Sequence, residues 1–535
     1  MQPSPDAVAE LIETYAGPGA DATRLLCRRH PRDAVAFTVI ESDLSSRDLT
    51  FGELDDAAGR LAAGLTELGV SPGDRVATLM GKSAELVTAL LAIWRIGAVH
   101  VPLFTAFAPP AIALRVQGSG AKLVITDPDQ RAKLDAGGPG VVVSTGRATG
   151  PDVSFHDLLD RPGDAEPVAV GGHGTLIELY TSGTTGSPKA VPVPLRALAG
   201  MHAYQVFGLD HTDQDVFWNA ADPGWAYGLY YAIVAPLAVG RRSLLLGAGF
   251  SPELTWQVLS RFGVTNFTAG PTAYRALRAA QLPPPEGLRL RHCSSAGEPL
   301  TPDVIGWARE AIGVPVRDHY GQTETGMTVA NAWHPALVDD IEPGSMGRPL
   351  PGWTIEVLHP DHDTPVPAGQ SGRVAVDVAH SPLMAFTGYR DAPDRTAERF
   401  SADGRWYFTG DLATRDAAGR LTFGARDDDV ILTAGYRIGP FEVESALTRH
   451  PAVIEAAVVG EPDELRGEVI VAYVVVRAGQ PTGDAFTAEL QQLVKSELAA
   501  HAYPRRVHVV DQLPRTPSGK VQRFQLRASG SGRSR

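Results

Sequence analysis

At 535 residues the chain is several times longer than one hydrophobic core requires, so its length predicts about three or four domains. Hydrophobic residues make up 44% of the sequence and charged residues 20%, which is typical of a globular protein in water. The formal net charge of −13 argues against a nucleic-acid partner, because phosphate backbones favour basic surfaces. A nucleotide remains compatible with this charge, since it needs only a local nest of N–H groups and one or two cations.

Cysteine content and apolar segments indicate the cellular compartment and whether the chain spans a membrane. The two cysteines, Cys27 and Cys293, are far apart in the sequence and argue against a disulfide framework or a Cys-rich metal site. The N-terminus has neither the basic start nor the apolar run of a signal peptide. The apolar segments Ala84–Phe104 and Trp225–Gly240 are expected to be buried core, because one contains charged residues and the other is short. We therefore expect a cytoplasmic protein without a membrane span.

The first half of the chain alternates helical and strand signals, which predicts an α/β fold. Thr50 and Glu53 have the spacing of a capping box, which predicts a helix that begins there and ends before Gly69. The next expected elements are a strand at Val76–Met80, a helix at Ala84–Ile96 and a strand at Ala98–Leu103.

An acidic cluster that begins after Arg426 is the best candidate for a domain boundary, because a compact α/β pattern follows it. This boundary at residues 427–429 separates an N-terminal domain over residues 1–426 from a C-terminal domain over residues 430–527. The polar, Gly/Ser-rich residues 528–535 are expected to be disordered.

The most informative motif is the stretch Tyr180–Lys189, which combines hydroxyl side chains, two glycines and a lysine after an apolar strand. Glycine lets the backbone approach an anion closely, and N–H groups and hydroxyls can surround phosphate oxygens. The lysine adds a mobile positive charge, although the pattern lacks the Gly-Lys-Ser/Thr ending of a Walker loop. Taken alone, the stretch fits either a phosphate-binding loop or a polar surface turn.

A second polar cluster runs from Asp318 to Gly326. Tyr320 can stack on a purine, Asp318 can accept from an exocyclic amine, and Glu324 can hold a hard cation through oxygen. A strand-end loop with capping hydroxyls is the alternative interpretation. The upstream turn Ser294–Pro299 carries almost no specificity by itself.

Two further clusters complete the set. Asp411 ends the aromatic strand that starts at Trp406 and can hydrogen-bond vicinal hydroxyls, such as those of a ribose. The acidic run after Arg426 can equally be a solvated turn. Near the C-terminus, Lys520 follows the rigid turn Pro514–Gly519, where an isolated lysine is ordinarily a solvated charge.

In this order and spacing, the four clusters resemble the adenylate-forming (AMP-binding) superfamily, which includes acyl-CoA synthetases, carrier-loading adenylation domains and luciferases. The resemblance covers the chain from Thr50 to about Leu526. It implies an α/β fold with a large multi-subdomain adenylation domain and a small, mobile α/β lid that rotates between two half-reactions. It also implies that ATP and Mg²⁺ convert a carboxylic acid to an acyl-adenylate with release of pyrophosphate, and that CoA accepts the acyl group.

The resemblance implies a role for each matching position. The residues matched to ATP and AMP binding are Thr181, Ser182, Gly183, Thr184, Thr185, Gly186 and Lys189 in the phosphate loop, Gly297, Glu298, Pro299, Asp318, Tyr320 and Gln322 around the adenine, and Asp411 and Arg426 at the ribose. Thr323 matches an α-phosphate contact, Glu324 the Mg²⁺ ligand and Asp428 the hinge. Lys520 matches the lysine that bridges the carboxylate and the α-phosphate, where a cation offsets the repulsion between two anions.

Three details resemble the acetyl-CoA and medium-chain acyl-CoA synthetases more than the carrier-loading domains: Asp222–Trp225, Tyr320–Thr325 and Gly435–Glu444. In that subgroup Gly435 lines the thiol tunnel, and Arg437 lies near the phosphates or CoA.

By the same resemblance, the acyl pocket is lined by Trp225, Ala226, Tyr227, Ala296 and Gly321. Acetate-specific relatives carry a tryptophan at the position of Gly321, so a glycine there implies space for a longer or aromatic acid. Tyr227, Tyr230 and Tyr231 can refill that space, or can be ordinary core residues.

Two other activity classes stay open. A stand-alone adenylating enzyme can pass its acyl group to a separate carrier protein, an amine or another nucleophile. A non-catalytic binding relative is disfavoured, because Lys189, Glu324, Asp411 and Lys520 are all present. The expected partners are a small-molecule carboxylic acid, ATP and CoA, and the identity of the acid is open.

Overall fold

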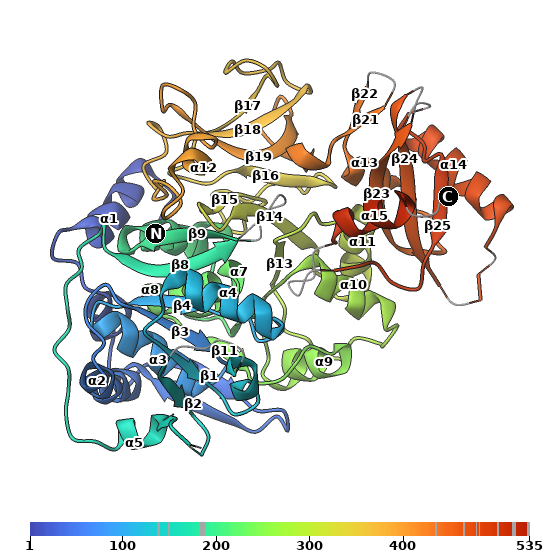
Figure 1. The fold of residues 1–535 in the computed structure, drawn as a ribbon. Helices are drawn as coiled ribbons and strands as arrows, with labels where there is room; N and C mark the ends of the chain where they lie inside the picture. The colour runs from blue at the N-terminus through green and yellow to red at the C-terminus, as the bar shows by residue number, and fades with distance from the viewer. Residues whose placement is uncertain are drawn as a thin grey trace.

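The computed structural model describes residues 1–135, 140–147, 150–181, 188–433, 436–463, 466–477, 479–480, 482–499, 502–515 and 521–531. Two sheets and their helices form a large body, and a third sheet forms a smaller one at the C-terminal end of the chain, on the right of Figure 1. The predicted α/β fold class, with a large and a small part, is confirmed.

The first sheet has seven strands, parallel except for the final antiparallel pair β8–β9. In spatial order they are β7 (Val153–Ser154), β6 (Val142–Ser144), β5 (Leu123–Thr126), β3 (Arg75–Leu79), β4 (Val99–Pro102), β8 (Thr175–Thr181) and β9 (Lys189–Pro194). Strands β4 and β5 are buried throughout and β3 nearly so, as continuous apolar runs covered on both faces should be. The strands predicted at Val76–Met80 and Ala98–Leu103 are confirmed within one residue or two.

A second, continuous path of thirteen strands forms the rest of the large body. In spatial order they are β17 (Ile355–Leu358), β18 (Ser371–Asp377), β19 (Trp406–Arg415), β20 (Leu421–Arg426), β16 (Ser345–Pro349), β15 (Gly326–Ala330), β14 (Val316–Gln322), β13 (His292–Ala296), β12 (Asn266–Ala269), β10 (Phe217–Asn219), β11 (Ser243–Leu246), β1 (Val35–Ile40) and β2 (Ser46–Thr50). From β14 to β1 the neighbours are parallel, and the remaining pairs are antiparallel.

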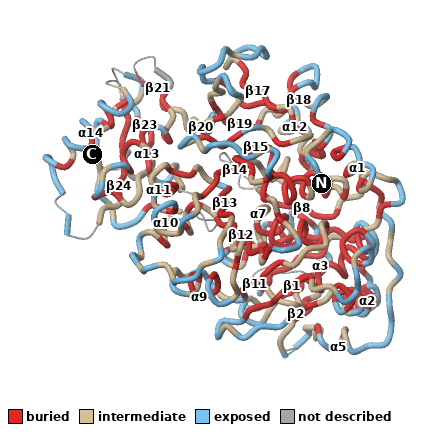
Figure 2. Tube along the Cα trace, turned by 180° about the vertical axis from the view of Figure 1, so that it is seen from behind, coloured by how far each residue is buried: buried red, intermediate tan, exposed pale blue. Residues whose placement is uncertain are grey.

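Helices cover the two large sheets, and the strands between them are mostly buried (Figure 2). The helices of the large body are α1 (Pro5–Ala16), α2 (Phe51–Glu67), α3 (Ala84–Arg95), α4 (Pro109–Ser119), α5 (Phe155–Leu159), α6 (Leu198–Ala203), α7 (Ala226–Gly228), α8 (Ala235–Val239), α9 (Pro252–Arg261), α10 (Pro271–Ala279), α11 (Pro302–Ala311) and α12 (Pro393–Ala397). The capping box of α2 is confirmed, since Thr50 and Glu53 satisfy each other's backbone N–H groups.

The two apolar segments are core, as expected. Helix α3 is buried from Leu86 onwards, and a second buried run extends from Gly228 through the π-helical turn Leu229–Val234 to Ala238 of α8, whereas Trp225, Ala226 and Tyr227 are partly buried. None of the helices in the described ranges combines the length and apolarity that a membrane crossing requires.

The small body has one five-stranded sheet and its own apolar core. Its strands are β22 (Tyr436–Ile438), β21 (Ile431–Thr433), β24 (Gly467–Val476) and β23 (Val453–Asp463), with β25 (Arg506–Val509) beside β24. Its helices are α13 (Pro440–Leu447), α14 (Asp484–Glu497) and α15 (Arg523–Ser531). A short 3₁₀ turn, Asp427–Asp429, lies between β20 and β21, at the place where the hinge is predicted.

Helix α15 extends to Ser531 and so overlaps the start of the tail expected from residue 528. Leu526 is buried in the cluster formed by β23 and β24, and Arg527 donates to Asp429 at 2.7 Å.

One buried ion-pair cluster joins α2 to α3. Arg95 is 1% exposed and donates to Asp55 at 2.7 Å and to Asp164 at 2.6 Å. Its Nε also donates to the Ala165 carbonyl at 2.5 Å. Asp55 also accepts from Arg28 at 3.0 Å, so its carboxylate is fully used in holding the two helices together.

We expect Asp55→Asn to destabilise the large domain by about 3 kcal/mol, because a buried guanidinium loses its main counter-charge. The neighbouring Asp56 provides the control, since it pairs with Arg32 at 2.8 Å while the two side chains are 54% and 63% exposed. Asp56→Asn should cost less than about 1 kcal/mol. Urea-unfolding midpoints of the two variants check this, and equal shifts would contradict it.

Candidate active site

The predicted adenine segment follows the carboxyl end of β13. Ala296 is the last residue of the strand, and Gly297 follows with a φ of +99°. That conformation favours glycine, so Gly297 is required for the chain to turn away from the sheet here. The next strand in the sheet, β14, runs parallel to β13, so both strands deliver polar residues to one edge.

Asp318 lies in β14 opposite Ser295 of β13 and is buried. Its Oδ2 accepts from the Leu300 amide at 3.3 Å, whereas its Oδ1 has no hydrogen-bond partner among the residues that the structure describes. Burial raises the pKa of Asp318 well above its ordinary value, because the charged form loses its hydration. An exocyclic amine would supply the missing donor, so this carboxyl fits the expected adenine contact.

Asp411 in β19 contacts side chains of β14 and β20. It is 4% exposed and stands in register with Arg426, whose Nη1 lies 3.3 Å from Oδ1. Its Oδ2 accepts from the Tyr320 hydroxyl at 2.5 Å and from Gln322 Nε2 at 2.8 Å. The structure thus brings three predicted site residues together on the buried carboxylate of a fourth, which is suited to accept from vicinal hydroxyls.

Tyr389, which no sequence pattern marked, hydrogen-bonds the predicted metal ligand Glu324. Glu324 lies in the turn between β14 and β15, and its Oε1 accepts from the Tyr389 hydroxyl at 2.8 Å. Lys189, the first residue of β9, places its Nζ 4.8 Å from the centre of the Tyr389 ring. Burial, followed by the Glu324 carboxylate, raises the pKa of Tyr389, so its hydroxyl keeps its proton and acts as a donor.

The position of Tyr389 depends on its neighbour. Arg390 forms an ion pair with the buried Glu178 of β8 at 3.0 Å, and its backbone N–H donates to the Ala190 carbonyl at 3.0 Å. The segment is therefore fixed to the two strands that flank the predicted phosphate loop. No charge pattern marked Tyr389 in the sequence, because the contact joins residues 65 positions apart.

The donor set fits the expected cation. Among the described residues no group of three or more His, Cys, Asp or Glu side chains converges as a metal cage does. Mg²⁺ usually binds through one or two carboxylates together with substrate phosphates, and Glu324 can supply one such oxygen ligand. Thr323 precedes it, and the Thr323 carbonyl accepts from the Tyr230 hydroxyl at 3.1 Å.

Three of the predicted acyl-pocket residues, Trp225, Ala226 and Tyr227, lie at the start of α7. Trp225 packs against Phe104 and Phe107, with ring centres 5.4 Å and 5.3 Å away; neither phenylalanine was expected from the sequence. Tyr227 lies at the start of α7, where its hydroxyl is 3.1 Å from the Tyr204 hydroxyl. Ala226 begins the same helix.

Gly321 has a backbone role in addition to any role in the pocket. A Cβ atom on Gly321 would lie 2.1 Å from the Gly326 carbonyl oxygen and 2.6 Å from Met327 Cα. The β14–β15 register shifts between Tyr320 and Gly321, so the strands approach too closely there for any side chain. Tyr231 supports the same hairpin, since its hydroxyl accepts from the Met327 amide at 2.8 Å.

Of the three tyrosines that can refill the pocket, two are core residues. Tyr230 and Tyr231 are at most 1% exposed, and each holds backbone of the β14–β15 hairpin through its hydroxyl. Tyr227 is only partly buried.

Several predicted site residues lie outside the described part of the chain. They are Ser182, Gly183, Thr184, Thr185 and Gly186 of the phosphate loop, Gly435 of the thiol tunnel and Lys520. For Asp428 and Arg437 the structure describes the backbone only. Their roles stay predictions.

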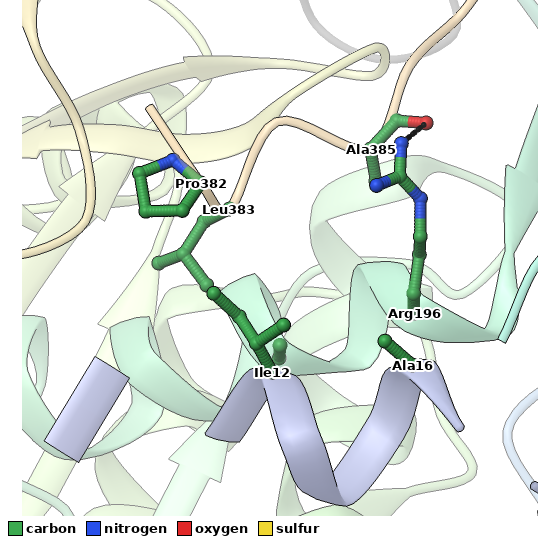
Figure 3. Close-up of a pocket in the computed structure, with 7 residues that line it drawn as sticks. Ile12, Ala16, Arg196, Pro382, Leu383 and Ala385 are labelled. Carbon is green, nitrogen blue, oxygen red and sulfur yellow. Dashed lines mark hydrogen bonds between the residues drawn. The ribbon is translucent and has the colours of Figure 1, made fainter. Parts of the chain in front are cut away.

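A small cavity lies elsewhere, between α1, α6 and the loop at residues 382–385 (Figure 3). Its volume is about 20 Å³, which is room for roughly one water molecule. It is lined by Ile12, Ala16, Arg196, Ala199, Pro382, Leu383 and Ala385. None of the predicted site residues lines it, and Arg196 spans it to donate to the Ala385 carbonyl at 3.2 Å.

Comparison with known proteins identifies the family. The sequence profile of the AMP-binding enzyme family matches residues 24–389, and that of the AMP-binding enzyme C-terminal domain matches residues 442–520. Acetyl-coenzyme A synthetase of Bacillus subtilis is 35% identical over 505 residues, covering 90% of this chain and 84% of its own. The mitochondrial acyl-coenzyme A synthetase ACSM3 of Rattus norvegicus is 36% identical, covering 92% of this chain and 86% of its own.

A solved structure agrees. The crystal structure of Brucella canis acyl-CoA synthetase is 41% identical, covers 100% of both chains and superposes with a TM-score of 0.77. The predicted family, fold and enzyme class are therefore confirmed. This chain belongs to the AMP-binding enzyme family.

Proposed function

We propose that the chain uses Mg-ATP to convert a carboxylic acid to an acyl-adenylate, releasing pyrophosphate, and then transfers the acyl group to the CoA thiol. The products of the second step are acyl-CoA and AMP. The observation that carries the proposal is the buried Asp411 carboxylate, on which Tyr320, Gln322 and Arg426 converge within 3.3 Å. The sequence relationship to acetyl- and acyl-coenzyme A synthetases supports the class of reaction.

The proposed roles follow from charge. Attack of a carboxylate on the α-phosphate brings two anions together, so cations must offset their repulsion. Lys189 serves the phosphates from one side, Lys520 serves the junction between acid and phosphate, and Glu324 holds Mg²⁺. The metal would neutralise phosphate charge when bound. Asp318 and the Gly297–Pro299 segment receive the adenine.

We propose that Trp225, Ala226, Tyr227 and Ala296 border the acid, with Phe104 and Phe107 behind Trp225.

Gly435 and Arg437 serve CoA, and Asp428 is the pivot between the large domain, residues 1–426, and the small one, residues 430–527. A separate carrier protein, an amine or another nucleophile is the alternative acceptor. Two buried free thiols accord with a cytoplasmic protein.

One screen tests both steps. Pyrophosphate release is measured with short, medium, branched and aromatic acids, and the best acid is then offered to CoA, a phosphopantetheinylated carrier and hydroxylamine. Acid-dependent release followed by thioester on CoA is expected. A product on the carrier or amine alone would favour the alternative acceptor, and no release with any acid would overturn adenylation.

Lys520→Ala should abolish adenylation and spare the second step. We expect a loss of about 10²–10³-fold in pyrophosphate release, the usual effect of removing one preorganised group at a developing charge. Thioester formation from supplied acyl-adenylate should keep its rate, because the two anions no longer have to meet. Equal losses in both half-reactions would show that Lys520 does not act in one step only.

Tyr389→Phe should raise the Mg²⁺ requirement of pyrophosphate release by about tenfold, because Glu324 loses a hydrogen bond to its charged group. Calorimetric titration of the protein with Mg-ATP should show the same weakening. Thioester formation from acyl-adenylate should not change. Tyr15→Phe is the control, since this hydroxyl lies 2.9 Å from His202 Nδ1, away from these residues. Equal effects of the two substitutions would contradict the role of Tyr389.

Gly321→Ala should lower activity toward every acid by the same factor. The added methyl group meets backbone 2.1 Å away, so it strains the β14–β15 hairpin and not one class of substrate. The melting temperature should fall as well. A chain-length profile of kcat/KM under saturating ATP and CoA measures this. A profile displaced toward acetate in a fully stable variant would instead support Gly321 as the pocket floor.

A further inference from the structure

Four charged side chains alternate in sign between the large and small domains. Arg275 Nη2 lies 2.9 Å from Glu298 Oε2, and Arg275 Nε lies 3.5 Å from Glu455 Oε1. The second oxygen of Glu455 is 2.7 Å from Arg515 Nη2. The four side chains are only 14–20% exposed, so water screens them less than it screens surface pairs.

The four residues come from separate elements. Arg275 belongs to α10 and Glu298 to the predicted nucleotide segment after β13, whereas Glu455 is in β23 of the small domain. Figure 1 shows α10 and α11 of the large domain facing the small domain. A hydrogen bond of 3.4 Å from Arg515 to Thr272 Oγ1 joins the two sides a second time.

The small-domain end of this chain of charges adjoins the segment of Lys520. The backbone of Arg515 pairs with that of Val521 in an antiparallel bridge, and Lys520 directly precedes Val521 in the sequence. The residues on both sides of 516–520 are thereby attached to the nucleotide side of the large domain. This orientation is the one that the proposed role of Lys520 in adenylation requires.

We propose that Arg275 and Glu455 form a latch that holds the small domain in the adenylation orientation and opens when that domain rotates for thioester formation. This rests on the proposed two-step function. Both are positioning residues, because they act on where Lys520 is presented and not on the reacting atoms.

The pairing explains how such a latch can open at low cost. Breaking a buried ion pair is expensive when it leaves a charge alone. Here Arg275 keeps Glu298 inside the large domain, and Glu455 keeps Arg515 inside the small domain. Rotation therefore breaks the 3.5 Å contact and the Arg515–Thr272 bond while each of the two charges keeps one partner in its own domain.

Glu455→Gln tests the latch, since it preserves shape and removes the charge. We expect pyrophosphate release to slow about three- to tenfold, as loss of one partly buried ion pair predicts. Thioester formation from supplied acyl-adenylate should be unchanged or faster. Arg275→Gln should slow pyrophosphate release to the same extent. The double variant should release pyrophosphate no more slowly than either single variant.

The matched control is Glu461→Gln, on the same strand. Glu461 pairs at 2.7 Å with Arg506 of its own domain, so its loss can lower stability but should not change the ratio of the two half-reactions. An equal ratio in Glu455→Gln and Glu461→Gln would overturn the proposal.

Domain orientation gives a second readout. Spin labels on cysteines placed at the exposed Glu286 and Asp484 report the distance between the domains, while the native thiols are buried. Glu455→Gln should broaden that distance distribution, and an unchanged distribution would overturn the latch. If the proposed function were wrong, the wild type itself would release no pyrophosphate with any acid. Failure of the latch is therefore distinguishable from failure of the proposed function.

Discussion

The parallel pairing of β13 with β14 is the constraint on which the site depends. Because the two strands run in the same direction, the segments after Ala296 and Gln322 emerge at one edge of the sheet. The antiparallel turn into β15 then reverses the chain and starts the antiparallel path that leads through β16 to β20 and β19. The Asp411–Arg426 register pair is thereby delivered to Tyr320 and Gln322.

The two buried carboxyls of this edge have opposite environments. Asp318 receives one backbone donor, and burial raises its pKa. Asp411 accepts from two neutral donors and lies beside a guanidinium. The neighbours of these two aspartates therefore give them different roles. Asp318 keeps one acceptor oxygen open, and Asp411 organises the side chains around it.

The features that could be predicted from the sequence are those that a local pattern encodes. Apolar runs marked β3 and β4, the Thr50–Glu53 spacing marked the start of α2, and the order of the motifs indicated the family. Contacts between distant segments left no such signal. Tyr389 reaches Glu324, and Arg275 reaches Glu455, only after folding brings their strands and helices together. Gly321 was interpreted by its missing side chain, whereas the structure shows that the close approach of two backbones also requires it.

The β8–β9 hairpin has a consequence for how this chain can vary. Thr181 pairs with Lys189 and Tyr180 with Ala190, in an antiparallel ladder at the edge of an otherwise parallel sheet. Successive side chains of a strand point to opposite faces, so slipping β9 by one residue would turn Lys189 away from Tyr389. The register of β9 is therefore constrained during evolution by the position of its first residue, Lys189.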